Sequence, residues 1–358
     1  MRLDPLQFEQ RKKDHIQLAL EDRNQAFGLT QLEQVQLVHD SLPEFNLSEV
    51  SLKPESAIIT QTPFFIAGMT AGHAQAVSLN HVLAAVAAQR GWVLGLGSQR
   101  REFANLLAGE AYADPSVAEL FKKFPKLKVV SNLGIAQLIE AHQGQALSRW
   151  IQHLEQLGVS AIGIHLNALQ EAIQPEGTPA FQGCLAALNE LLERSPLPVL
   201  IKETGCGFSR ASFKKILSLG ALKRAKLIID VSGLGGTHWG RIEGQRSVED
   251  SVSARLGETF KDWGVSTVAS LRNAKEVFGN HANVEIWASG GVRTGLDAAK
   301  LIALGATRVG FAMPALKAAL KGELAVHEWM ETIEAELKVA MFCTNSIHLK
   351  QLGRDHRE

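Results

Sequence analysis

A neutral base, two amides and a carboxylate lie close together at the end of one apolar segment. Ala161–Leu166 has the length and composition of a buried strand, and His165 and Asn167 are two residues apart, so they share a face of it. Gln170 and Glu171 follow where the strand ends. The carboxyl end of a barrel strand is where barrel enzymes keep their catalytic residues. A polar loop that caps a buried strand is the alternative that these residues alone leave open.

A second candidate group lies near the N-terminus. Arg11, Lys12 and His15 lead into a segment with helical character, and Arg11 and His15 would be one helical turn apart on the same face. Such a basic group can bind an anion. A solvated helix face is the alternative, and these residues alone favour it.

Two glycine-containing loops in the last third of the chain indicate phosphate binding. Gly290-Gly291 follows the apolar segment Val284–Ala288, and Thr294 with Asp297 has the pattern of a helix N-cap whose positive end can bind an anion. Gly310-Phe311-Ala312-Met313 forms the second loop. Loops after strands seven and eight are the common phosphate site of barrels, so we favour phosphate binding over plain turns.

The elements that must position these groups alternate between strand-like and helical segments from residue 61 onward. Eight consecutive strand–helix units predict a (β/α)8 TIM barrel at residues 61–358, preceded by a short N-terminal helical extension at residues 1–60. Within the extension, Leu47–Leu52 is a candidate short strand. The stretch 232–283 is longer than one crossover helix needs and predicts an extended loop with at least two helices. The predicted strands are Phe64–Ala67, Val93–Leu96, Lys128–Ser131, Ala161–Leu166, Val199–Lys202, Leu227–Val231, Val284–Ala288 and Arg308–Phe311.

Composition excludes several classes of partner. Lys plus Arg and Asp plus Glu number 37 each, so no overall positive field attracts nucleic acid or an anionic membrane surface. The chain has no apolar run long enough to cross a bilayer and no secretory signal pattern. Three scattered cysteines without metal-type spacing suit a reducing compartment. We therefore expect a cytoplasmic enzyme that acts on a small molecule.

The loops at the predicted barrel mouth suit a flat ring system with a phosphate tail. Hydroxyls, amides and glycines follow the first three strands, and Lys202 ends the fifth. Flavin mononucleotide (FMN) fits this lining, and a lysine at the strand end could tune the electronics of the ring.

Several motifs together resemble one known family. The most specific are Gly97-Ser98-Gln99-Arg100 and His165-Leu166-Asn167-x-x-Gln170-Glu171. With them the chain resembles the type II isopentenyl diphosphate isomerases, which are flavin-dependent (β/α)8 barrels, from residue 11 to beyond 316. Further matching motifs are Arg11-Lys12 with His15, Met69-Thr70, Ser131-Asn132-Leu133-Gly134, Lys202-Glu203, Gly205-x-Gly207-x-Ser209, Asp230 to Thr237 and Ala288 to Arg293.

The resemblance implies interconversion of isopentenyl and dimethylallyl diphosphate by reduced FMN with Mg²⁺, while NADPH or NADH keeps the flavin reduced. It implies a homotetramer or larger homo-oligomer. Gln170 and His165 would be catalytic, and Glu171 would bind the metal. The implied substrate residues are Arg11, Lys12, His15, Ser98, Gln99, Arg100, His165 and Gln170. The implied FMN residues are Met69, Thr70, Ser98, Asn132, Lys202, Ser209, Thr237, Gly291, Arg293, Ala312 and Met313.

Other flavin barrels remain as alternatives. An FMN-dependent 2-hydroxy-acid oxidase or dehydrogenase would need a base histidine where this chain has Leu234, and His238 lies four residues further on. A nucleotide dehydrogenase barrel would need a nucleophilic cysteine, for which Cys206 is the one plausible candidate. A flavin-binding barrel without activity is the third alternative. Ala71, Thr178–Ala180 and the bulky Met313 depart from the pattern expected of the isomerase family.

Overall fold

The strands of the predicted barrel are present. The computed structural model describes residues 13–55, 57–69, 74–109, 115–353 and 356–357. All eight predicted strands form, with ends that differ from the prediction by at most one residue. They are β2 (Phe64–Ile66), β3 (Val93–Gly95), β4 (Lys128–Val130), β6 (Ile162–Leu166), β7 (Val199–Glu203), β8 (Leu227–Asp230), β9 (Val284–Ala288) and β10 (Arg308–Phe311), with the two-residue β5 (Leu133–Gly134) after β4.

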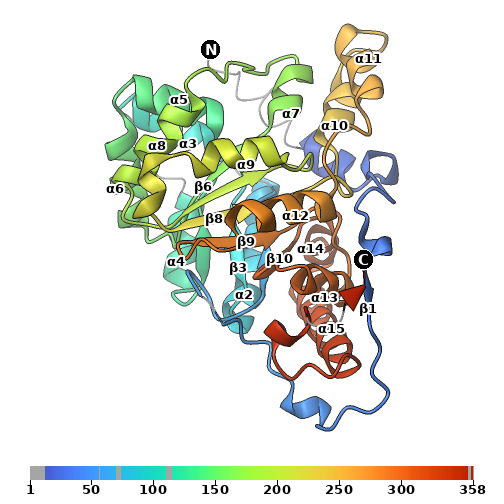
Figure 1. Ribbon diagram of the computed structural model, residues 1–358. Coiled ribbons are helices and arrows are strands. Elements are labelled where there is room, and N and C mark those ends of the chain that lie inside the picture. The colour runs from blue at the N-terminus through green and yellow to red at the C-terminus, as the bar shows by residue number, and fades with distance from the viewer. Residues whose placement is uncertain (1–12, 56, 70–73, 110–114, 354–355, 358) are drawn as a thin grey trace.

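The sheet is parallel and curls into a ring (Figure 1). Its order is β4-β3-β2-β10-β9-β8-β7-β6-β5, so β2 pairs with the last strand β10. The ring is closed between β4 and β6, where Ser160 N donates to Val129 O at 2.8 Å and Ser131 N donates to Ala161 O at 3.1 Å. The (β/α)8 barrel prediction is therefore confirmed.

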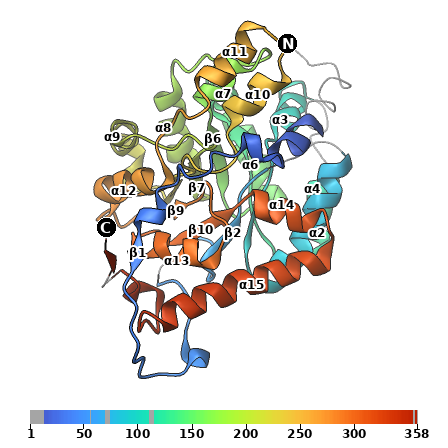
Figure 2. The same cartoon turned by 90° about the vertical axis from the view of Figure 1, so that its right-hand side faces the viewer.

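Helices surround the ring, and three of them occupy the long connection between β8 and β9 (Figure 2). Two of these, α10 and α11, pack against α7 beside the carboxyl ends of the strands, and α15 closes the outer wall. The helices are α2 (Ala74–Arg90), α3 (Arg100–Leu107), α4 (Pro115–Lys123), α5 (Ile135–Gln143), α6 (Leu147–Leu157), α7 (Ala168–Ile173), α8 (Cys184–Arg194), α9 (Arg210–Leu217), α10 (Trp239–Arg246), α11 (Val252–Thr259), α12 (Thr267–Phe278), α13 (Gly295–Ala303), α14 (Met313–Ala319) and α15 (Glu323–Phe342).

One predicted strand of the N-terminal extension is wrong. Leu47–Glu49 forms a short 3₁₀ helix, because Asn46 and Glu49 cap it reciprocally through side chain and backbone. Within Leu47–Leu52, Ser51 alone makes an isolated β-bridge, with His348. Residues 13–19 are helical as expected, whereas Arg11 and Lys12 lie outside the described residues.

Alternate residues of the strands feed two separate apolar clusters. Phe64 and Ile66 face the helices and join the large outer core, while Phe65 points into the barrel. The inner cluster combines Phe65 with Leu200, Trp287 and five other buried residues, so side chains fill the barrel interior. Any ligand must therefore bind at an end of the barrel and not within it.

A buried ion pair closes the amino-terminal end of the barrel. Arg308 Nη1 lies 2.6 Å from Glu285 Oε2, and the two side chains are 0% and 5% exposed. Trp287 Nε1 and the backbone N–H of Ile58 also donate to the Glu285 carboxylate, and Arg308 Nη2 donates to Thr60 O. The segment before β2 is thereby fixed under the barrel, so this end is a structural plug.

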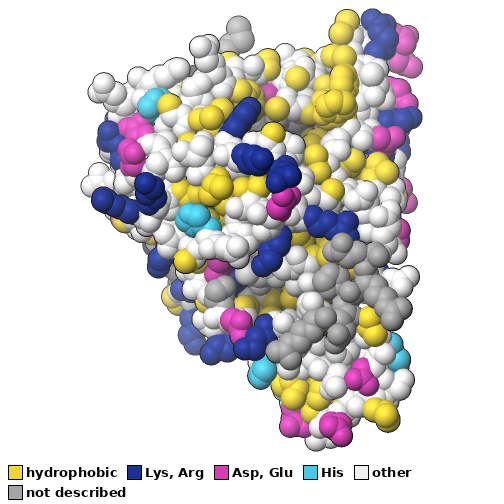
Figure 3. Space-filling view, in the orientation of Figure 1, with side chains coloured by type: hydrophobic (Ala, Val, Ile, Leu, Met, Phe, Trp, Pro, Cys, Tyr) yellow, Lys and Arg dark blue, Asp and Glu magenta, His cyan; other side chains and the backbone are white. Residues whose placement is uncertain are grey.

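The visible surface mixes both signs of charge (Figure 3). Exposed apolar side chains gather over α10 and α11, where Val248, Val252 and Trp263 are 80%, 64% and 62% exposed. Within the described ranges, no helix has both the length and the apolar character that crossing a membrane requires.

The plug generates a stability prediction. Glu285→Ala leaves the guanidinium of Arg308 buried without its carboxylate, which costs on the order of 3–5 kcal/mol of unfolding free energy. Urea unfolding followed by tryptophan fluorescence measures this loss. The exposed Glu249 is the matched control, and Glu249→Ala should change stability by less than about 0.5 kcal/mol. Equal stability of the two variants would contradict the conclusion that the Arg308–Glu285 pair stabilises the barrel.

Candidate active site

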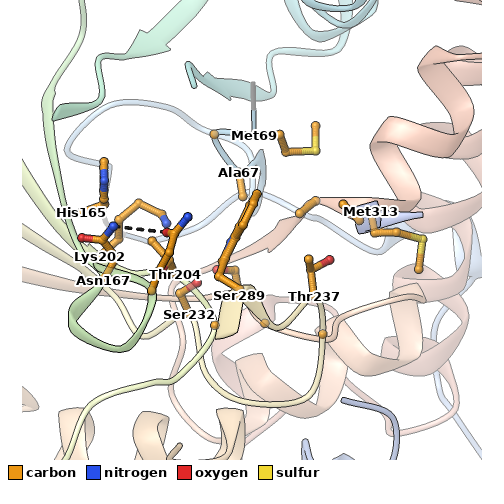
Figure 4. Close-up of a pocket in the computed structure, with 18 of the residues that line it drawn as sticks. Ala67, Met69, His165, Asn167, Lys202, Thr204, Ser232, Thr237, Ser289 and Met313 are labelled. Carbon is orange, nitrogen blue, oxygen red and sulfur yellow. Dashed lines mark hydrogen bonds between the residues drawn. The ribbon is translucent and has the colours of Figure 1, made fainter. Parts of the chain in front are cut away.

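A pocket opens at the carboxyl ends of the barrel strands, where the sequence predicted the site. Figure 4 shows His165, Asn167, Lys202 and Thr204 on one side of it and Met313 and Thr237 on the other. Predicted residues that line the pocket are His15, Met69, Ser98, Arg100, Asn132, His165, Gln170, Glu171, Lys202, Thr237, Gly291, Arg293, Ala312 and Met313.

Two predicted residues do not line this pocket. Gln99 is 1% exposed and lies behind it, where its side-chain oxygen accepts from the backbone N–H of Asn132 at 3.0 Å. Ser209 caps α9 by accepting from Ser212 N at 3.1 Å. Arg11, Lys12 and Thr70 lie outside the described residues. The roles assigned to these five positions stay predictions.

A chain of hydrogen bonds fixes the tautomer of His165. Asn132 Nδ2 donates to Leu96 O at 2.9 Å, so the other side-chain atom of Asn132, Oδ1, is the one that faces His165 Nδ1 at 2.8 Å. An amide oxygen only accepts, so Nδ1 carries a proton. When the imidazole is neutral, its Nε2 is therefore the acceptor, and protonation turns Nε2 into a donor.

Asn167 organises the residues that follow β6. It occupies the N-cap position of α7, and its Nδ2 donates to Gln170 Oε1 at 3.2 Å and to Glu171 Oε1 at 3.0 Å. Glu171 Oε2 accepts from Thr178 N at 2.6 Å. Each oxygen of Glu171 keeps a lone pair for a cation, and Mg²⁺ needs few protein ligands when a phosphate supplies the others. No group of three or more His, Cys, Asp or Glu side chains forms a metal cluster within the described ranges.

Glu243 on α10 connects the two predicted substrate groups. Its side chain has no exposed surface, and its Oε1 accepts from Gln170 Nε2 at 2.8 Å and lies 3.0 Å from His15 Nε2. Arg246 pairs with the other oxygen and also with Glu176 at 3.0 Å. Burial raises the pKa of Glu243, but hydrogen bonding and charge from His15, with Arg246 and Gln170, outweigh it and lower the pKa to about 2. Glu243 is thus a fixed anion that orients His15 and Gln170.

Buried ionisable side chains lie at the base of the pocket, and one of them, Lys202, lines it. Lys202 Nζ donates to Glu203 O at 2.6 Å, and burial lowers its pKa although the charges of Asp230 and Glu203 oppose that shift. Asp230 accepts from Ser289 Oγ at 2.8 Å. Burial raises the pKa of Glu203 to about 7 against the pull of several backbone donors. Those donors include the N–H groups of Thr204 and Gly205, at 2.6 and 2.7 Å from Oε2, so this carboxylate shapes the loop after β7.

The predicted phosphate end differs in one respect from expectation. The first N–H groups at α13 are taken by carboxylates of the protein itself: Asp297 accepts from Thr294 N at 3.0 Å, and Glu336 accepts from Gly295 N. Gly291 has φ 73°, and a Cβ there would lie 2.3 Å from Gly235 O, so glycine is required by the turn. The α13 end is therefore filled by these carboxylates, not open to an anion.

The remaining groups at this end still suit a phosphate tail. Gly290, Gly291, Val292 and Arg293 line the pocket opposite Ala312 and Met313. Arg293 is half-buried, and no described residue is a hydrogen-bond partner of its Nε. A guanidinium that lines a pocket with an unsatisfied N–H can donate to a phosphate oxygen. These residues would suit the phosphate of a flavin nucleotide.

Two residues that the alternatives require do not line this pocket. His238 is 0% exposed. Its Nε2 lies 3.1 Å from Trp263 O, and its Nδ1 accepts a hydrogen bond from Arg241 N. Cys206 lies beside it at 3.8 Å, and burial raises the pKa of its thiol. Neither residue is placed to act as a base or nucleophile on a ligand in the pocket.

Comparison with known proteins identifies the family. The chain is 46% identical over 347 residues to an isopentenyl-diphosphate delta-isomerase of Legionella pneumophila (strain Corby), an alignment that covers 97% of this chain and 96% of that protein. This chain belongs to the isopentenyl-diphosphate delta-isomerase family. Proteins with the same name from Bdellovibrio bacteriovorus and Methanoregula boonei are 43% and 38% identical, over 97% and 96% of this chain and 96% and 92% of theirs.

A family model for FMN-dependent dehydrogenases matches residues 252–358 of this isomerase-family chain, which include both predicted phosphate loops. Among solved structures, a flavocytochrome b2 variant with sulfite bound has a TM-score of 0.66 at 15% identity, covering 97% of this chain and 82% of that one. Mandelate oxidase with (S)-2-phenylpropionate has a TM-score of 0.61 at 17% identity, covering 100% and 99%. At such identities the likeness shows the barrel fold alone.

The structure adds residues of the pocket that sequence reasoning missed. They include Glu243, Gln25, Gln174 and Trp239, which line the pocket or orient residues that do. The unusual length of the β8–β9 connection marked its region as functional, but no local motif distinguished Glu243 from other acidic residues on helices.

The depressed pKa of Glu243 predicts how its contribution depends on pH. The folded pKa of about 2 lies below the ordinary 4.5, so between these values the unfolded chain binds more protons and stability rises with pH. The contribution is complete above about pH 4.5 and is lost as the pH falls towards 2. Its size is on the order of 3 kcal/mol at 1.36 kcal/mol per pKa unit.

Glu243→Gln should therefore be less stable than the wild type in urea at about pH 6, and the gap should narrow at about pH 3. Glu249→Gln, at an exposed site, is the control. A gap of the same size at both pH values would show that the charge of Glu243 does not stabilise the folded state.

Proposed function

We propose that this chain interconverts isopentenyl diphosphate and dimethylallyl diphosphate by shifting one double bond. The observation that supports it most strongly is 46% sequence identity to an isomerase over 97% of this chain. It is combined with a pocket lined by His15, His165, Gln170 and Glu171. Reduced FMN supplies the proton-transfer chemistry when it is bound. Mg²⁺ on the diphosphate and NADPH or NADH as reductant complete the proposal.

In this proposal the polar side of the pocket binds the diphosphate. Arg100, His15 and His165 donate to its oxygens, together with Arg11 and Lys12 of the N-terminal segment, and Glu171 holds the metal. Such binding energy positions a hydrocarbon that has no polar handle of its own. Gln99 acts indirectly, through Asn132, whose backbone N–H it holds.

The apolar side of the pocket excludes water from the reacting carbons. Ile16 and Ala19 of the N-terminal segment, Leu316 and the ring of Trp239 line it, and Trp239 lies edge-on to His15 with ring centroids 5.0 Å apart. Protonation of an alkene gives a tertiary cation that water would capture, so a dry site is required. The face of an aromatic ring also favours a nearby positive charge.

The flavin side is assigned to the remaining residues. The residues that hold FMN in this proposal are Met69, Thr70, Ser98, Asn132, Lys202, Thr237, Gly291, Arg293, Ala312 and Met313. Ser209 supports them through the start of α9.

We further propose that the chain divides into an N-terminal extension, residues 1–60, and the barrel, residues 61–358. We also propose that it assembles into a homotetramer or a larger homo-oligomer.

Anaerobic turnover tests the reaction. Purified protein with FMN, Mg²⁺ and a reductant should convert isopentenyl diphosphate to dimethylallyl diphosphate without net consumption of the reductant, as measured by chromatography of the products. Oxidation of a 2-hydroxy acid with flavin reduction, and no isomerisation, would favour the oxidase alternative. Bound flavin without either reaction would favour a barrel that has lost activity.

Gln170→Ala should lower turnover by about a hundredfold or more, because a small misplacement of a substrate costs on that scale and Gln170 would position the substrate. Flavin absorbance of the purified variant should remain, since Gln170 lies on the substrate side. Gln152→Ala, at an exposed position of α6, is the control and should leave turnover unchanged. Wild-type turnover in Gln170→Ala would remove this residue from the mechanism.

A further inference from the structure

The N-terminal segment 13–26, which we call the arm, is built into the loop between β8 and α10 (Figure 1). Ala26 N donates to Gly236 O at 2.8 Å, and His238 N donates to Asn24 O at 2.9 Å. Gln25 and Thr237 thereby form an isolated antiparallel β-bridge. Arg241 Nη1 also donates to Gln25 O at 2.8 Å. The backbone of Gln25 is therefore fixed beside the pocket.

The side chain of Gln25 can be oriented without ambiguity. Its Nε2 lies 2.8 Å from Ala19 O and 3.0 Å from Thr237 Oγ1. A backbone carbonyl only accepts, so the atom that touches both groups must be the amide nitrogen. It donates to Thr237 Oγ1, and the single hydrogen of the Thr237 hydroxyl is left to be donated elsewhere.

This arrangement leaves two unused hydrogen-bonding groups on residues that line the pocket. Gln25 is 3% exposed, and its Oε1 has no hydrogen-bond partner among the described residues. Gln25 and Thr237 both line the pocket, and a Cβ on the adjacent Gly236 would lie 2.6 Å from Gly291 N, at the phosphate loop. A buried acceptor and a donor side by side are costly unless a ligand satisfies both.

We infer that Gln25 and Thr237 together bind a hydroxyl group of the sugar-alcohol chain of the flavin nucleotide, and that this contact couples the cofactor to the arm. A hydroxyl can accept from Thr237 and donate to Gln25 Oε1 at once, whereas a fully ionised phosphate can only accept. The inference rests on the proposed function for the identity of the cofactor.

The cofactor and the substrate site are coupled because the arm that carries Gln25 also carries residues of the substrate site. His15 and Ile16 line the substrate side of the same pocket, and His15 is held by Glu243. When the cofactor satisfies Gln25, the arm gains a contact at its far end, and the position of His15 becomes better defined. Cofactor binding therefore prepares the substrate site through the arm as well as through the barrel.

The test measures flavin binding by quenching of flavin fluorescence in wild type, Gln25→Leu and Thr237→Val. Each variant should raise the Kd for FMN by about tenfold, the loss expected for one or two buried hydrogen bonds. Thr237→Ser keeps the hydroxyl and should bind like the wild type. Because the two residues act on one group, their effects should not add. The Kd of the double variant for FMN should be about the same as that of the weaker-binding single variant.

Three flavins locate the contact. The loss of affinity in Gln25→Leu and Thr237→Val should persist with riboflavin, which lacks the phosphate. It should vanish with lumiflavin, which lacks the sugar-alcohol chain. A loss seen with FMN but not with riboflavin would place the contact on the phosphate and overturn the inference. An equal loss with lumiflavin would mean that the variants act by distorting the ring site, which also overturns it.

Hydrogen exchange of the arm tests the coupling. FMN should slow exchange of the amides in residues 13–26 of the wild type and of Gln17→Leu, an exposed arm position, but not of Gln25→Leu. Equal protection in all three proteins would overturn the coupling. A wild type that binds no flavin would refute the proposed function itself, whereas unchanged FMN affinity in Gln25→Leu and Thr237→Val refutes only this inference.

Discussion

A closed ring of parallel strands brings the carboxyl ends of all its strands to one rim. Here the ring is completed by the hydrogen bonds that join β4 to β6, and its interior is filled by Phe65, Leu200, Trp287 and their neighbours. Because Arg308 and Glu285 plug the opposite end, a ligand can reach polar residues from several strands only at the open rim. The location of the pocket follows from this topology, and the loops decide what it binds.

Buried carboxylates set the shape of those loops. Glu203 gathers the backbone N–H groups that follow β7, Asp230 holds Ser289, and Glu243 holds His15 and Gln170. Burying a charge is costly unless hydrogen bonds and opposite charges compensate it, and each of these groups has such partners. Once compensated, the carboxylates confine flexible donors to single orientations. The precision of the site thus comes from residues that need not touch a ligand.

The sequence predicted the barrel well because strand length, apolar content and the glycines after strands are local properties. The rim residues that follow strands, such as His165 and Lys202, were predictable for the same reason. Glu243 and Gln25 were not, because their roles arise from contacts across more than 70 and 200 residues, with Gln170 and Thr237. The filled N-terminus of α13 was also missed, since Glu336 reaches it from α15, 41 residues away.

The same long-range contacts explain why an extension outside the barrel belongs to the active site. The ring alone offers a rim open to solvent, which suits a flavin but not a cation that water would capture. The arm and α10 cover one side of that rim, and they are joined to each other through Arg241, Glu243 and the backbone at Gly236. Neither can move without disturbing the other. A barrel that must exclude water therefore needs the arm to fold against α10, and the polar contacts between them make that cover part of the catalytic pocket.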